Sequence, residues 1–165
     1  MDFTAHYDSP LGGITMASDG TSLIGLWFDG QKYFGYVLDT HHKVQSDLPV
    51  FVQTKHWLDV YFSGKDPGFT PPLVMRANDF RRAVWKQLLA IPYGCKSSYG
   101  EIARRIAAER GLISMSAQAV GNAVGHNSIS LIIPCHRVVG ANGALTGYAA
   151  GVDKKMWLLK LEGSM

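Results

Sequence analysis

The chain has 165 residues, of which 47% are hydrophobic and 18% are charged, so its composition is that of a globular protein and excludes a disordered one. It has no apolar run of membrane-spanning length and no basic-then-apolar leader, so we expect neither a membrane protein nor a secreted one. Its two cysteines, Cys95 and Cys135, cannot form a disulfide framework, and we therefore expect a cytoplasmic location with reduced thiols.

The net charge of +3 is distributed unevenly along the chain. Residues 1–77 hold five Lys or Arg against eight Asp or Glu, whereas residues 78–165 hold eleven against five. A basic half indicates a polyanionic partner, although solvated helix faces can give the same count. The scattered histidines and the two cysteines show no metal-ligand spacing, so we expect no bound metal.

The first half of the chain has the pattern of a small antiparallel sheet covered by a helix. A helical pattern of apolar residues at 50–62 is expected to pack on that sheet. Gly and Pro residues then interrupt the chain, and we place the boundary of an N-terminal α/β domain at residue 77. The predicted strands are short alternating segments separated by turn-forming residues, at 3–8, 13–18 and 23–28.

The second half, residues 78–165, changes to helical patterns and predicts a mainly α domain. Asn78 or Asp79 can cap a helix that reaches about Ile91. Ser98 opens a capping box for a helix that ends near Glu109.

A third helix follows after a tight turn, over about residues 117–125, with Ser114 or Ser116 as its cap. The helix that ends near Glu109 and the helix at 117–125 have the spacing of a helix-turn-helix. Asp153 can cap a final helix, and Glu162 near its end is unfavourable for the helix dipole, which indicates either a surface residue or a partner for a buried group.

The helix at 117–125 has an unusual surface of small residues. Its two glycines cost roughly 1 kcal/mol each relative to alanine, so some gain must offset them. Close packing against a neighbouring helix and close approach to a nucleic-acid groove are equally good explanations. The small residues are Ala117, Ala119, Gly121, Ala123 and Gly125.

The most informative stretch is Cys135-His136, which follows an apolar run at 129–133 and Pro134. The β-branched residues of the run predict a short buried strand or extended segment, and proline should end it. A thiol acts as a nucleophile only as the thiolate, which a neighbouring histidine favours. A bare Cys-His pair is more often a buried hydrophobe beside a polar neighbour, so the pair alone does not assign a function.

Together these residues resemble the O6-alkylguanine-DNA alkyltransferase family, whose active-site signature Pro-Cys-His-Arg-Val stands here at 134–138. The likeness runs almost continuously from Asp79 to Gly163 and is weaker before residue 77. It implies a small ribonuclease-H-like domain followed by a domain with a winged-helix-like helix-turn-helix. The other matching residues are Trp85, Tyr93-Gly94, Ser98-Tyr99, Ala119-Val120-Gly121, Asn127, Thr146-Gly147-Tyr148, Lys155, Trp157-Leu158-Leu159 and Glu162-Gly163.

The resemblance implies a catalytic role for several positions. Cys135 is the expected alkyl acceptor, His136 the base that takes its proton through a water, and Glu162 the acid that orients His136. Asn127 is similar to the hinge asparagine of the family, and Tyr99 to the tyrosine that drives nucleotide rotation.

The resemblance also implies which residues contact substrate and DNA. Val138, Tyr148 and Val124 correspond to pocket walls, and Ala149 to the residue whose backbone N–H meets guanine O6. The DNA-binding positions are expected at Ala117, Gln118, Ala119, Gly121 and Arg137. Gln118 is a departure, because the family commonly has an arginine there, and we expect weaker DNA affinity or altered flipping.

The expected function is therefore repair of double-stranded DNA by irreversible transfer of the alkyl group from O6-alkylguanine, and from O4-alkylthymine, to Cys135 after minor-groove binding and nucleotide flipping. We expect a monomer that needs no cofactor. Two alternatives stay open: a non-catalytic helix-turn-helix binder, which Gln118 would suit, and a cysteine hydrolase using Cys135 and His136, for which no oxyanion-hole signature is visible.

Overall fold

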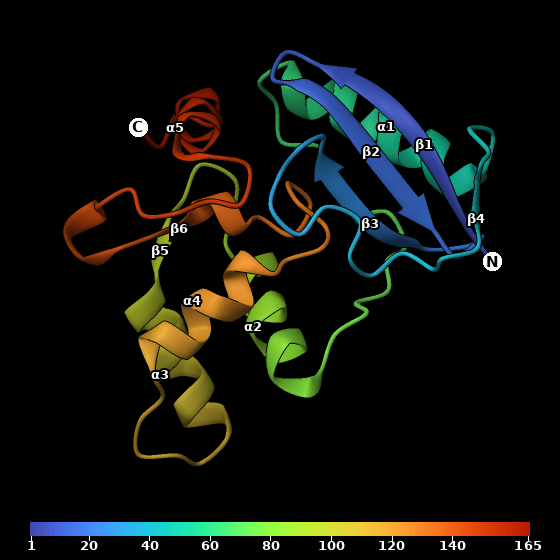
Figure 1. The fold of residues 1–165 in the computed structure, drawn as a ribbon. Coiled ribbons are helices and arrows are strands. Elements are labelled where there is room, and N and C mark those ends of the chain that lie inside the picture. Colours follow the sequence, from blue (N-terminus) through green and yellow to red (C-terminus); the bar gives the residue numbers. More distant parts are fainter. The chain divides into compact units, whose positions relative to one another are not determined.

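The computed structural model describes residues 1–165, which form two compact units (Figure 1). The first unit comprises Met1–Arg76 together with Ser128–Ile132, and the second comprises Ala77–Asn127 together with Ile133–Met165. The sequence did not indicate that five residues beside the Cys-His pair belong to the first unit. The boundary at residue 77, as a limit of independently folding domains, stays a prediction. None of the helices is long and apolar enough to cross a membrane.

The sheet of the first unit has the strand order β3-β2-β1-β4. The three predicted strands are confirmed and pair antiparallel, whereas the short fourth strand, parallel to β1, was not predicted. The turns form as the sequence indicates, since the Asp19 carboxylate accepts the backbone N–H groups of Thr21 and Ser22 between β2 and β3. The strands are β1 (Asp2–Ser9), β2 (Gly12–Ser18), β3 (Leu23–Phe28) and β4 (His42–Val44).

Helix α1 (Pro49–Phe62) lies across β1 and β2, as expected (Figure 1). Proline suits the first helical position, where no intrahelical N–H bond is lost. The buried face of α1 includes Trp57 and Tyr61, whose rings stack with centroids 5.1 Å apart. Large aromatic rings bury much apolar surface, so this pair contributes to the stability of the first unit.

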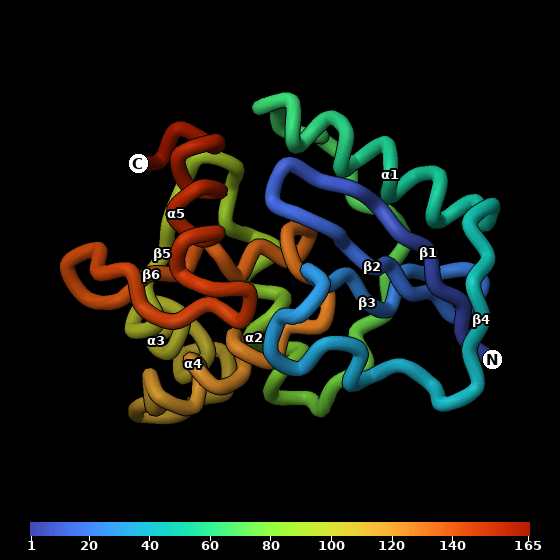
Figure 2. Tube along the Cα trace, turned by 45° about the horizontal axis from the view of Figure 1, so that its top comes forward, coloured from blue at the N-terminus to red at the C-terminus, as the bar shows by residue number.

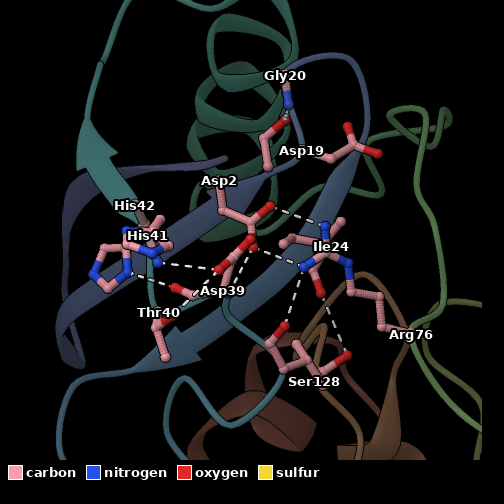
Figure 3. A network of polar contacts seen from close by, with 12 residues as sticks. Asp2, Asp19, Gly20, Ile24, Asp39, Thr40, His41, His42, Arg76 and Ser128 are labelled. Atoms are coloured by element: carbon pink, nitrogen blue, oxygen red, sulfur yellow. Dashed lines mark hydrogen bonds and ion pairs between the residues drawn. The ribbon is translucent and has the colours of Figure 1, made fainter.

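An ion pair joins the start of the first unit to its end (Figure 3). The buried carboxylate of Asp2 accepts two bonds from Arg76, from Nη1 at 2.7 Å and from Nη2 at 2.9 Å. It also accepts the backbone N–H of Asp39 at 2.7 Å. The bidentate geometry fixes the start of strand β1 and the end of the segment Met1–Arg76 against each other.

The edge of β3 is covered by two segments from elsewhere in the chain. Pro72 accepts the N–H of Leu23. Ser128 accepts the N–H of Leu26 at 2.8 Å, and the N–H of Ser130 donates to Leu26 at 2.9 Å. Figure 3 shows Ser128 beside Ile24, where its hydroxyl donates to the Ile24 carbonyl. Both segments satisfy backbone groups that an edge strand would otherwise leave open.

The apolar run at 129–133 is buried, but the prediction of a strand there was wrong. Only Ile129 makes a bridge, with Leu26, and the residues that follow form a turn. Leu131 has φ 69°, a left-handed conformation that reverses the chain direction. Burial in a turn and burial in a strand leave the same apolar sequence pattern, so composition could not separate them.

The second unit contains the predicted helices with the predicted caps. Asn78, Ser98 and Ser116 each accept a backbone N–H in the first turn of their helix. Trp85 also donates from its indole Nε1 to the carbonyl of Ala123 at 2.9 Å, which ties α2 to α4. These helices are α2 (Asp79–Leu89), α3 (Tyr99–Glu109) and α4 (Ala117–Gly125).

The rest of the second unit consists of a short strand pair and the last helix. Strand β5 (Ser97–Ser98) pairs parallel with β6 (Val138–Val139), and the connection from β6 to α5 projects outward in both views (Figures 1 and 2). The last helix, α5 (Val152–Leu161), begins one residue before Asp153, so the prediction that Asp153 caps it was wrong. The remaining short helices are η1 (Cys135–Arg137) and η2 (Ala141–Gly143).

Candidate active site

Cys135 opens the short helix η1 directly after Pro134. After the proline, Cys135–Arg137 form one 3₁₀ turn. The turn is closed by the N–H of Arg137, which donates to Pro134, and by that of Val138, which donates to Cys135. Cys135 is 6% exposed, so its thiol lies within a protein-lined environment and not on the surface.

The thiol of Cys135 is subject to opposing influences. Burial raises its pKa, whereas a hydrogen bond from Asn127, the positive charge of Lys155 and the Tyr148 hydroxyl lower it. Asn127 also donates from Nδ2 to the carbonyl of Ile133 at 2.7 Å, which holds the segment just before the cysteine. Burial outweighs these groups, so the pKa of the Cys135 thiol stays above its ordinary value, and the polar neighbours only reduce the rise that burial causes.

His136 and Glu162 form the central pair of the site. The ring nitrogen Nε2 lies 2.6 Å from Oε2 of Glu162, and both side chains are completely buried. The pKa of Glu162 falls to about 2, because hydrogen bonds and charges from His136 and Arg137 outweigh the effect of burial. An ionised carboxylate can only accept, so Nε2 of His136 must carry the proton, and Nδ1 is the basic nitrogen of the neutral ring.

Arg137 requires a correction. It was expected at the DNA surface, but it is 8% exposed and its guanidinium bonds to groups within the second unit. Nε donates to Oε1 of Glu162 at 2.8 Å, and Nη2 donates to Oε2 at 3.2 Å. Nη1 donates to the carbonyl of Ile91 at 2.8 Å. The helix dipole disfavours a negative charge at the end of α5. Glu162 is stabilised there because its carboxylate accepts hydrogen bonds from the buried side chains of His136 and Arg137.

One further member of this network could not be read from the sequence. The backbone N–H of Gly94 donates to Oε1 of Glu162 at 3.2 Å. Gly94 has φ 78°, and a Cβ there would meet the Glu162 carbonyl at 3.2 Å, so glycine fits both the conformation and the space. The family resemblance includes Tyr93-Gly94, but it gave no indication that the N–H of Gly94 binds Glu162.

Lys155 was also missed as a functional residue. It is fully buried in α5, where a sequence pattern places lysines on the solvated face. Its Nζ donates to the carbonyl of Thr146 at 3.3 Å and lies 6.0 Å from the centroid of the Tyr99 ring. Burial lowers the pKa of Lys155, whereas Cys135 raises it, so the two groups influence each other electrostatically.

The strand pair β5–β6 connects Tyr99 with the segment after the cysteine. Ser98 pairs with Val139, and Tyr99 is the next residue along the chain, at the start of α3. The Tyr99 hydroxyl accepts a bond from Thr146 Oγ1 at 3.2 Å, and burial raises its pKa. The geometry thus gathers the residues expected to handle the substrate within one unit.

The other expected pocket residues differ in burial. Val124 and Val138 are buried, whereas Tyr148 and Ala149 are partly exposed. The pKa of Tyr148 is raised well above its usual value by burial and by the nearby Cys135, so its hydroxyl stays protonated beside the thiol. Their roles in substrate binding stay predictions.

Helix α4 buries one side and exposes the other, so close packing explains Ala123, whereas close approach to a nucleic-acid groove stays a prediction. Val120, Ala123 and Val124 are buried and pack inside the unit, whereas Ala117 and Gln118 are exposed. Ala119 and Gly121 are partly exposed. A Cβ at position 121 would lie 3.7 Å from the Tyr99 ring, an ordinary contact distance, so packing alone does not demand glycine there.

Comparison with known proteins covers both units. The family model for the ribonuclease-like domain of 6-O-methylguanine DNA methyltransferase matches residues 3–75, and the model for the DNA-binding domain of the same family matches residues 79–164. The methylated-DNA–protein-cysteine methyltransferase of Mycobacterium tuberculosis is 44% identical over 162 residues, 96% of this chain and 93% of the relative. The protein of that name from Methanosarcina acetivorans is 37% identical over 98% of this chain and 99% of its own length.

Solved structures of similar proteins share the fold of this chain. A crystal structure of Mycobacterium tuberculosis OGT in complex with DNA superposes with a TM-score of 0.83 at 43% identity, covering 99% of this chain and 92% of that one. The O6-methylguanine-DNA methyltransferase of Pyrococcus kodakaraensis, at 20% identity, shares the fold with a TM-score of 0.67 and 99% coverage of both chains. The predicted fold class, a small α/β unit followed by a helical unit with a helix-turn-helix, is confirmed.

Proposed function

Because the chain belongs to the 6-O-methylguanine DNA methyltransferase family, we propose that it repairs double-stranded DNA by transferring the alkyl group of O6-alkylguanine to Sγ of Cys135. The observation that carries this proposal is the buried His136–Glu162 pair, 2.6 Å apart, whose histidine lies on the same short helical turn as the thiol. A buried acceptor thiol suits a substrate that enters a pocket, as an extruded base does.

The transfer step starts with loss of the thiol proton. Nδ1 of His136 accepts this proton through a bridging water, and Glu162 holds the ring in the required tautomer. Sγ of Cys135 then forms a bond to the alkyl carbon, and the bond from that carbon to O6 breaks with its electron pair moving to guanine. Tyr99 supplies the proton that makes guanine a neutral leaving group. The tyrosinate that remains then takes up the proton held on His136, so both residues return to their neutral forms.

DNA binding is assigned to α4 in the minor groove. Its exposed positions, Ala117 and Gln118, and the partly exposed Ala119 and Gly121 let the helix backbone approach the groove closely. The target nucleotide must leave the stack, which costs a few kcal/mol and least for a damaged, poorly paired base. Tyr99, at the start of α3, would crowd the adjacent phosphate and favour rotation of the nucleotide.

The extruded base is expected to lie between Val138, Tyr148 and Val124, with the backbone N–H of Ala149 donating to O6. Val138 directly follows the turn that holds the thiol, so one pocket wall and the nucleophile share a short segment. A pyrimidine with an alkylated O4 presents a similar alkyl ether, and we extend the proposal to O4-alkylthymine.

The product is a thioether on Cys135. No step returns it to a thiol, since water does not cleave a thioether as it cleaves an acyl-enzyme. Each protein molecule therefore reacts once, and the reaction is stoichiometric without a cofactor.

The test is intact-protein mass after mixing with a duplex that carries one O6-methylguanine. We expect the gain of one methyl group, saturating at one per protein. Cys135→Ser should gain none, and Cys95→Ser, the matched exposed-cysteine control, should react like the wild type. Unchanged mass with retained DNA binding would instead identify a non-catalytic reader, and release of product in excess over protein would identify a hydrolase.

A further inference from the structure

The carboxylate of Glu162 has more partners than orientation of one histidine requires. Its Oε1 accepts from Arg137 Nε at 2.8 Å and from the N–H of Gly94 at 3.2 Å. Its Oε2 accepts from His136 Nε2 at 2.6 Å and from Arg137 Nη2 at 3.2 Å. A single arginine thus contacts both oxygens of the acid that holds the histidine.

We propose that Arg137 is a positioning residue for alkyl transfer: it fixes the Glu162 carboxylate and balances its charge, so that His136 stays uncharged and able to accept the Cys135 proton. This inference rests on the proposed function for its kinetic consequence. It assigns Arg137 a role inside the second unit in place of the DNA contact expected from the sequence.

Arg137 is itself held in place. Its Nη1 donates to the carbonyl of Ile91 at 2.8 Å, and its guanidinium lies 5.7 Å from the centroid of the Tyr93 ring. Both partners precede Gly94, whose N–H bonds to the same carboxylate. The segment after α2 therefore fixes the arginine and the acid together, which leaves the planar guanidinium little freedom to turn toward DNA.

The charges around His136 explain why such a residue is needed. A buried carboxylate alone at 2.6 Å would favour an imidazolium, and an imidazolium has no free nitrogen to take a proton. The charged groups that act on His136 are Arg137 on the same turn, Lys155 on α5 and Glu162 at the end of α5. The pKa of His136 is lowered by burial and further by Arg137 and Lys155, against the raising effect of Glu162.

The consequence is a change in pH dependence when the arginine charge is removed. In Arg137→Gln, which keeps an amide donor for the carboxylate, the negative charge of Glu162 faces His136 without the compensating charge of Arg137, and Lys155 alone remains against it. His136 should then hold a proton to higher pH and lose its capacity as a base below that pH. A residue that merely supports the fold would lower the rate by the same factor at every pH.

The direct experiment is a pH titration of 15N-labelled histidine in the free protein, with the His136 signal identified by its loss in His136→Gln. In Arg137→Gln we expect the His136 midpoint to rise by at least about one pH unit, a tenfold change in proton affinity. Arg82→Gln, an exposed arginine on α2, should leave the midpoint unchanged. An unchanged midpoint in Arg137→Gln overturns the proposal.

The second measurement is the rate of methyl transfer from a saturating O6-methylguanine duplex across the same pH range. The acid limb of the Arg137→Gln profile should move with the His136 midpoint and approach the wild-type rate at high pH. A loss that is equal at all pH values overturns the proposal. A wild type that transfers no methyl refutes the proposed function, while the titration still decides the effect of Arg137 on His136.

If Arg137→Gln does not fold, variants without the carboxylate replace it. Glu162→Gln leaves the positive charge of Arg137 beside His136, and Arg137→Gln/Glu162→Gln removes it. The His136 midpoint should be higher in the double variant than in Glu162→Gln. Equal midpoints overturn the proposal.

Discussion

Oε2 of Glu162 lies 2.6 Å from Nε2 of His136, although 26 residues separate them along the chain. The acid ends the last helix, and the histidine lies in a 3₁₀ turn after Pro134, so the pair exists only through the packing of α5 on η1. Because the pair is completely buried, its protonation is linked to the stability of the second unit.

The first prediction concerns Glu162→Gln and acid stability. The folded pKa of Glu162, about 2, lies below its ordinary value of 4.5, so the charged group stabilises the fold above pH 4.5 and this stabilisation is lost as the pH falls toward 2. The difference in unfolding free energy between wild type and Glu162→Gln should therefore narrow by up to about 3 kcal/mol over that range. Urea unfolding at a series of pH values measures it.

The control is Asp153→Asn, which changes an exposed acid in the first turn of the same helix. This variant also removes one negative charge but leaves the buried pair intact, so the dependence on pH that Glu162→Gln shows beyond this control belongs to the pair. A constant difference for Glu162→Gln would contradict the linkage.

The second prediction concerns Lys155→Met. The buried ammonium lowers the pKa of Cys135, so its removal should raise that pKa and reduce the thiolate fraction at neutral pH. A change of about one pKa unit gives roughly tenfold slower reaction of the thiol at pH 7. The rate of iodoacetamide addition to Cys135, followed by mass in a Cys95→Ser background, measures this change.

Lys160→Met is the matched control, since Lys160 is an exposed lysine in the last turn of α5. It should react with the wild-type pH dependence. Identical profiles for Lys155→Met and Lys160→Met would show that the charge of Lys155 does not act on the thiol.

The sequence predicted correctly those helices and strands whose formation depends on residues close together along the chain. The serine before α3 and the serine before α4 accept first-turn N–H groups because a short side chain there satisfies an otherwise open donor. The strands of the first unit followed from alternation and from the residues of the Asp19 turn. The resemblance placed Cys135, His136 and Glu162 in one site, and the structure brings these three together on η1 and the end of α5.

Features that depend on partners distant along the chain were not predictable in this way. The Arg137–Glu162 contact joins residues 25 positions apart, and nothing in either local pattern distinguishes it from surface charge. Lys155 is buried in a helix whose sequence would suit exposure, and the turn at Leu131 depends on pairing with β3. In each case the tertiary contact outweighs the local preference.

The third prediction concerns the cap of α4. Ser116 Oγ accepts the N–H of Ala119 at 3.2 Å, so Ser116→Ala should destabilise the second unit by about 1 kcal/mol. The sequence also allowed Ser114 as the cap, and Ser114→Ala is the matched control because Ser114 is exposed and lies outside the helix. Urea unfolding with an unchanged m-value tests both variants, and equal effects would contradict the cap assignment.

The last prediction rests on the proposed function and concerns Gln118, the second residue of α4, whose side chain is exposed. Gln118→Arg adds a positive charge on the surface assigned to DNA. If the side chain approaches a phosphate, duplex affinity should rise at low salt, and the slope of log K against log salt should steepen by about 0.9. Fluorescence anisotropy with a labelled duplex at several salt concentrations measures this slope.

Gln118→Met separates charge from size, because methionine has a similar length without a charge. It should keep the wild-type salt slope, and any change in affinity then reports how the side chain fills space beside the DNA. A salt slope unchanged in Gln118→Arg would place position 118 away from the phosphates. The proposed chemistry occurs at Cys135, so the mass gain should still saturate at one methyl group per protein in both variants. A different number of methyl groups per protein would mean that position 118 affects the transfer step as well as DNA binding.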